Sequence, residues 1–213
     1  MEPDWLVWAR QIQSLAQSGL AFTRDAYDRE RYEALRLLAA EMMAARSGGN
    51  PARIEALFAE QTGYATPKVD VRGAVFDRDG RVLLVREAAD GGRWTLPGGW
   101  ADVNQAPSEC VAREVLEEAG IAVRVRKLAC VYDRARHPHQ PPYPFHIYKM
   151  FFVCEPLDGV EHVRGDGHET TAAALFARDE VPEAELSTGR VLPFQIRRLF
   201  EHWRHPELPT DFD

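Results

Sequence analysis

The chain has 213 residues, of which 45% are hydrophobic and 28% charged, enough for one ordinary domain and a small second one. Acidic residues (33) outnumber lysine and arginine (26), and the formal net charge of −7 argues against binding along a nucleic-acid backbone, which favours clustered basic residues. No apolar run approaches the roughly 20 residues that cross a bilayer, and the acidic start is unlike a signal peptide. We therefore expect a small-molecule ligand, and neither nucleic acid nor a membrane as a partner.

The sequence up to about residue 63 predicts three helices and a small all-α domain over residues 1–64. Asp4 is the predicted cap of the first helix, which ends near Gly19, and the second helix runs from about Thr23 to Arg46. Asn50-Pro51 opens the third helix, because asparagine caps well and proline suits the first helical position. Two apolar stripes are predicted, and their members are Trp5, Trp8, Ile12 and Leu15 on the first helix and Tyr32, Leu35, Leu38 and Met42 on the second.

These stripes predict a homodimer. Three helices in about 60 residues make a marginal core alone, and oligomerisation is a common remedy. Aromatic residues are also enriched at protein interfaces. The alternative is that the stripes pack against the rest of the same chain.

After Pro67 the hydrophobic period changes to that of strands. Residues 69–87 predict a hairpin around Asp79-Gly80, followed by a short strand at 93–96 and a glycine-rich loop at 97–105. A helix is predicted from about Pro107 to Ala119. The remaining predicted elements are strands at Val123–Tyr132, His146–Cys154 and Ala172–Phe176 and a helix at Leu192–Trp203. This order favours a mixed-sheet α/β domain over residues 67–205 and a tail at 206–213.

The three cysteines, Cys110, Cys130 and Cys154, include no C-x-x-C pair. This pattern favours neither a disulfide framework nor a zinc site, and it is typical of a protein in the reducing cytoplasm. We expect all of them to be small buried apolar residues.

The segment REVLEEAGI (113–121) carries three glutamates at helical positions i, i+3 and i+4: Glu114, Glu117 and Glu118. They share one helical face, where like charges cost about 0.2–0.5 kcal/mol per pair. Carboxylates gathered in this way form a hard-oxygen site for Mg²⁺ or Mn²⁺, and the cation removes the repulsion.

The longer segment GGWADVNQAPSECVAREVLEEAGI closely resembles the signature of the Nudix hydrolases. Eight positions are in register, namely Gly99, Arg113, Glu114, Val115, Glu117, Glu118, Gly120 and Ile121. The resemblance implies a Nudix α/β/α sandwich that hydrolyses a nucleoside diphosphate linked to another group X. It implies that Mg²⁺ or Mn²⁺ is bound by the glutamates and the Gly99 carbonyl, and that Arg113 holds and orients the glutamates.

One position departs from the family pattern, because Gln105 replaces the first family glutamate. A neutral amide can only hydrogen-bond, so we expect a softer loop and no lost metal ligand. Asp102 could take over part of the charged contact. The general base of the family often lies outside the signature, and Glu169, in a glycine-rich loop before a strand, is the first candidate. Glu117 is the second.

Similarity in the flanking segments extends over nearly the whole chain to a subgroup with an N-terminal helical domain, whose members act on CDP-choline, ADP-ribose or UDP-linked compounds. The alternatives are a nucleoside triphosphate pyrophosphohydrolase and a non-catalytic nucleotide sensor. Arginines suit phosphate and aromatic rings suit bases. The predicted substrate-binding residues are Arg72, Arg86, Gly98, Trp100, Arg134, His137 and His146.

Overall fold

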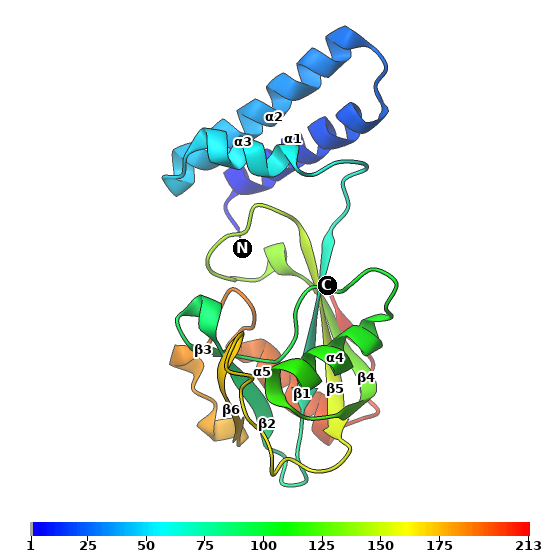
Figure 1. Ribbon diagram of the computed structural model, residues 1–213, viewed down its shortest axis with the longest axis vertical. Coiled ribbons are helices and arrows are strands. Elements are labelled where there is room, and N and C mark those ends of the chain that lie inside the picture. The colour runs from blue at the N-terminus through cyan, green and yellow to red at the C-terminus, as the bar shows by residue number, and fades with distance from the viewer. Residues whose placement is uncertain (1) are drawn as a thin grey trace. The chain divides into compact units, whose positions relative to one another are not determined.

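The computed structural model describes residues 2–213 and divides into two compact units (Figure 1). One unit is helical and comprises the chain up to Lys68 together with Pro142–His146. The other is α/β and comprises Val69–Pro141 and Ile147–Asp213. The predicted fold class, an α/β domain preceded by a helical part, is confirmed.

The helical unit contains α1 (Asp4–Phe22), α2 (Ala26–Ser47) and α3 (Pro51–Ala59). Asn50 caps α3 through its side chain, as predicted. Asp4 is not a cap, because the helix begins after Pro3 without a side-chain cap. The predicted end at Gly19 is also wrong, because a Cβ on this residue would lie 2.4 Å from the Tyr32 ring. Gly19 therefore lets α1 and α2 approach closely while the helix continues.

The interior of the helical unit is built largely from small residues on α1 and α2. Ala9, Ala39 and Ala40 are fully buried, together with Leu6, Met43 and Phe58. Trp5, Ile12 and Met42 of the predicted stripes pack against this core. The other large side chains do not: Trp8 is 56% exposed, Leu15 60% and Phe22 69%. These three residues recur every seven positions and so follow one line along α1.

The α/β unit contains two sheets. The first has the order β1 (Lys68–Val75), β5 (Ile147–Pro156), β4 (Val123–Asp133) and β7 (Asp211–Phe212). The second has the order β3 (Arg93–Thr95), β2 (Val82–Glu87) and β6 (Thr170–Phe176). The short β7 runs parallel to β4, so part of the predicted tail pairs with a sheet edge.

The predicted hairpin is only partly correct. The turn forms, with the Asp77 amide donating to the Arg81 carbonyl at 3.1 Å, but β1 and β2 then enter different sheets. The backbone of β1 is instead bonded to the glycine-rich loop: the Val71 amide donates to the Gly99 carbonyl at 2.8 Å and the Gly73 amide to the Pro97 carbonyl at 2.9 Å. This loop takes the groups with which β2 would otherwise pair.

Two helices cover opposite faces of the strands. Phe151 of β5 belongs to one buried cluster with Leu199 and other residues of α5 (Pro193–Arg204), whereas its neighbour Phe152 belongs to a second cluster with Val111 and other residues of α4 (Pro107–Ala119). Successive side chains of a strand point to opposite faces, so the helices sandwich the sheet. The three cysteines are buried and free of disulfides, as predicted. Within residues 2–213, no helix is long and apolar enough to cross a membrane.

Candidate active site

The glutamate helix α4 is fixed at both ends by its own sequence. Pro107 occupies the first turn, and the Glu109 carboxylate accepts a hydrogen bond from the Ala106 amide at 2.8 Å. At the other end, Gly120 adopts the left-handed conformation that closes many helices. Cys110, Val111 and other apolar residues bury one face, and this burial sets the rotation of the helix and the direction of its glutamates.

Glu118 is the most buried of the three glutamates, with 5% of its surface exposed. Its Oε2 accepts a hydrogen bond from the Gly98 amide at 3.1 Å. Burial raises the pKa of this carboxyl to about 8, although the charge of Arg72 and the Gly98 bond oppose the shift. A carboxylate in this setting is stabilised by a cation.

Gly98, predicted to bind substrate, holds Glu118 in place. Its φ of +139° is open to glycine, and a Cβ there would lie 2.1 Å from the Val71 carbonyl oxygen. The position therefore requires glycine for two reasons, and the amide that results is directed at the Glu118 carboxylate.

Gly99 brings the same loop close to Glu114. A Cβ on Gly99 would lie 3.0 Å from Glu114 Oε2, so the missing side chain leaves room for this carboxylate. The Gly99 carbonyl accepts from the Val71 amide and keeps one further lone pair for a ligand. Glu114 is half-buried, and burial raises the pKa of its carboxyl in spite of the neighbouring Arg113.

Arg113 gathers the acidic residues around it. Its guanidinium lies 2.7 Å from Glu117, 2.9 Å from Glu114 and 2.7 Å from Asp102. Its Nε also donates to Gln105 Oε1 at 3.3 Å. Asp102 therefore makes the charged contact with Arg113, and Gln105 makes a neutral one. The shared arginine offsets part of the repulsion within the glutamate cluster.

Beneath the glutamates lies a buried charged group formed by Arg72, Asp70 and Lys149. Arg72 donates to both oxygens of Asp70, at 3.2 and 2.8 Å, and to the Leu96 carbonyl at 3.2 Å. Lys149 Nζ lies 2.5 Å from Asp70. Arg72, predicted to bind substrate, thus has its guanidinium engaged within the chain. Its positive charge acts on Glu118 from below.

Glu169 precedes β6 with an exposed side chain. Its loop is anchored to α4, because the Thr170 hydroxyl donates to the Glu118 carbonyl at 2.7 Å. Asp166 shapes the loop by accepting from the amides of His168, Glu169 and Thr170, and these bonds lower the pKa of its carboxyl to about 2. The candidate base is therefore attached one residue away from a contact with the glutamate helix.

The other predicted substrate residues are dispersed. Arg86 lies over the Trp94 ring at 4.9 Å and donates to Glu185 at 2.8 Å, while Trp100 is 46% exposed next to Gly99. Arg134 is buried and donates to the Pro141 carbonyl at 2.6 Å. His137 Nε2 lies 3.0 Å from Asp213 Oδ1. His146 belongs to the helical unit.

Three charged residues of the site were not predicted: Asp70, Lys149 and Glu87. Glu87 ends β2 with 13% of its side chain exposed, and its charge raises the pKa of Glu118. Asp70 and Lys149 lie within otherwise apolar strands that neighbour each other in the sheet. A single charge in an apolar strand is a signal that could have identified this pair.

The residues present fit a divalent cation. Glu114 and Glu118 are drawn out of solvent against a glycine loop, Glu117 lies on the same helical face, and the Gly99 carbonyl is adjacent. All of these donors are oxygen atoms, the ligand type that Mg²⁺ and Mn²⁺ prefer.

A glycine loop folded against a glutamate helix in an α/β/α sandwich defines the Nudix hydrolases, and the chain belongs to this family. The description "NUDIX domain" matches residues 66–194, and "UDP-X-like, N-terminal oligomerisation domain" matches residues 3–58. The chain is 45% identical, over 213 residues, to a Bacillus subtilis (strain 168) protein provisionally named ADP-ribose pyrophosphatase YjhB, covering 100% of this chain and 99% of the relative.

Two solved structures are also similar. An ADP-ribose pyrophosphatase from Streptococcus suis 89-1591 is 34% identical with a TM-score of 0.60, covering 70% of this chain and 100% of its own. A UDP-X diphosphatase is 31% identical with a TM-score of 0.59, covering 99% and 98%. The predicted family and its hydrolase class are thereby confirmed.

Proposed function

We propose that the chain hydrolyses the pyrophosphate bond of a nucleoside diphosphate linked to a group X, with Mg²⁺ or Mn²⁺ as cofactor. Water is consumed, and a nucleoside monophosphate and phospho-X are released. The observation that carries this proposal is the convergence of Glu114, Glu117 and Glu118 on the Gly98-Gly99 loop. The relatives named for ADP-ribose and UDP-X make ADP-ribose and UDP-sugars the first substrates to test.

Each residue of the site has a distinct part in this proposal. Glu114, Glu117, Glu118 and the Gly99 carbonyl would hold the cations. Bound divalent cations neutralise a diphosphate and lower the pKa of the attacking water. Arg113 keeps the carboxylates aligned through its contacts with Glu114 and Glu117. Glu169, on the loop anchored to α4 through Thr170, would accept the proton of the attacking water.

The substrate is tested with a panel of CDP-choline, ADP-ribose, UDP-sugars and deoxynucleoside triphosphates, each with Mg²⁺ or Mn²⁺. We expect a nucleoside monophosphate from at least one diphosphate compound, and no product in excess EDTA. Pyrophosphate released only from the triphosphates would contradict the substrate class. Full activity in EDTA would contradict the role of the cation.

We also propose that the chain forms a homodimer through its helical unit and acts in the cytoplasm. The match to an oligomerisation domain over residues 3–58 supports the dimer, as does the exposed line of Trp8, Leu15 and Phe22 on α1. Leaving such large apolar side chains in water is unfavourable, and burial between two copies removes the cost. The three buried cysteines without disulfides support a reducing compartment.

A further inference from the structure

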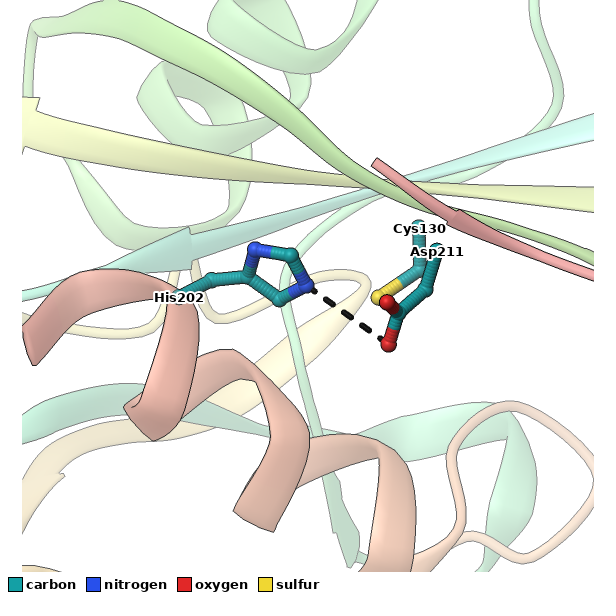
Figure 2. A group of neighbouring side chains, drawn as sticks. All are labelled: Cys130, His202 and Asp211. Atoms are coloured by element: carbon teal, nitrogen blue, oxygen red, sulfur yellow. Dashed lines mark ion pairs between the residues drawn. The ribbon is translucent and has the colours of Figure 1, made fainter. Parts of the chain in front are cut away.

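A second group of ligand-type side chains lies on the α5 side of the sheet, opposite the face that α4 covers. It contains Cys130 of β4, His202 of α5 and Asp211 of β7 (Figure 2). The thiol sulfur, one imidazole nitrogen and one carboxylate oxygen all lie within 4.8 Å of one another. Three elements that are distant in the sequence thus direct donor atoms at one point.

His202 provides an independent sign that this point is a binding site. The residue is 1% exposed, and within the described part of the chain neither ring nitrogen has a hydrogen-bond partner. Its Nε2 points toward Asp211 Oδ2 at 3.7 Å, too far for a hydrogen bond (Figure 2). A buried polar group without a partner costs about 1–3 kcal/mol, so a bound ligand that engaged the ring would remove this cost.

We propose that Cys130, His202 and Asp211 form a binding site for Zn²⁺ or a similar transition metal, separate from the glutamate site of α4. Thiolate, imidazole and carboxylate are the donors that zinc takes, whereas Mg²⁺ prefers oxygen alone. Three protein ligands leave one tetrahedral position for water or for the Tyr132 hydroxyl, which lies 3.4 Å from Asp211 Oδ2.

The charges around the cluster suit a divalent cation. Arg198 donates to both oxygens of Asp211 and also to Glu201, at 2.5 Å in the latter case. Because Glu201 balances Arg198, the Cys130 thiolate and the Asp211 carboxylate leave two negative charges for the metal. The Arg198 bond to Asp211 Oδ1, 2.8 Å long, can persist while Oδ2 turns to the metal. Hydrogen bonds of this kind commonly orient metal ligands.

Metal binding at this point would join the end of the chain to the sheet. β7 has only two residues, and Asp213 just beyond it lies 3.0 Å from His137 and accepts a hydrogen bond from the Asp133 amide at 2.6 Å. The metal would therefore fix the segment that supports the loop after β4. This role is structural, so metal content and stability can reveal it without an activity assay.

The test uses the full chain carrying Glu118→Gln to weaken the α4 site, stripped with a chelator and reloaded with Zn²⁺ or Co²⁺. We expect about one zinc retained per chain after gel filtration, with a metal–sulfur distance of about 2.3 Å by X-ray absorption. The Co²⁺ form should show a thiolate-to-metal charge-transfer band. Removing a ligand by Cys130→Ser or His202→Gln should weaken retention by roughly tenfold or more.

Cys154→Ser is the matched control, because Cys154 is also a buried free cysteine but belongs to the cluster on the α4 side. It should retain zinc and the cobalt band. Absence of the cobalt band in the chain with all three cysteines would overturn the proposal, and this spectrum does not depend on whether the cysteine variants fold. Equal zinc retention in Cys130→Ser and Cys154→Ser would overturn it as well.

Discussion

Replacing Asp102 with asparagine tests how the chain compensates for glutamine at position 105. Asp102 lies 2.7 Å from the Arg113 guanidinium, and the two side chains are 59% and 31% exposed. An ion pair of this exposure contributes about 0.2–1 kcal/mol. Glu114 and Glu117 remain beside Arg113 in the variant, so we expect a loss of about 0.5 kcal/mol in the free energy of unfolding.

The second substitution, Gln105→Glu, should restore what Asp102→Asn removes. Gln105 Oε1 already lies 3.3 Å from Arg113 Nε, so a carboxylate there can replace the lost charge. In the native background the same change adds a carboxylate to an arginine that is already surrounded by acids, and its effect should be within about 0.5 kcal/mol. The double variant should therefore be more stable than the sum of the two single effects.

Urea unfolding of the four proteins measures this coupling, and Mg²⁺ titration of the initial rate shows whether metal dependence changes. We expect a favourable coupling and unaltered metal dependence in all four. Strict additivity would refute the idea that Asp102 stands in for the family glutamate. A change in the number or affinity of bound metals in Gln105→Glu would show instead that position 105 belongs to the coordination shell.

Three further predictions concern other parts of the chain. Asp70 has a pKa lowered from 3.8 to about 2 because Arg72 and Lys149 outweigh its burial. Its stabilisation is therefore complete above pH 3.8 and is lost as the pH falls towards 2, by on the order of 2 kcal/mol. Asp70→Asn should flatten this acid limb in urea titrations, and parallel limbs would contradict the assignment. Glu169→Gln should lower kcat by roughly 10²–10⁴-fold at unchanged KM, and near-normal kcat across pH would exclude it as the base. Trp8→Glu should convert a dimer to a monomer in light scattering, and a persistent dimer would place the interface elsewhere.

Local spacing in the sequence was sufficient to predict the glutamate site. The glycine pair, the helix Pro107–Ala119 and the closing glycine are set by interactions within a few residues, so the pattern of positions carries the geometry. Arg113 and Asp102 are also close in the sequence, and their pairing was considered for the same reason. The helices of the first unit were predictable from their periodicity and caps, except where packing intervened at Gly19.

Contacts between distant segments could not be predicted in this way. The turn at Asp79-Gly80 is local, but the partner of β1 depends on a loop some 25 residues later, so the hairpin prediction failed. Arg72 resembles a free cation in the sequence, and only the neighbouring Asp70 and Leu96 carbonyl show that its guanidinium is engaged. The cysteine spacing gave no sign of a zinc site, because the ligands near Cys130 come from α5 and β7.

The central claim is that the α4 carboxylates hold the divalent cation on which hydrolysis depends. The most direct measurement is the initial rate of nucleoside monophosphate release at saturating Mg²⁺ for the native chain, Glu118→Gln and the control Glu109→Gln. Glu109 lies on the same helix and bonds only the Ala106 amide, a contact that glutamine can keep. We predict that Glu118→Gln lowers kcat by about a hundredfold or more, while the control stays near the native rate. Native turnover in Glu118→Gln, with Mg²⁺ still required, would contradict the account.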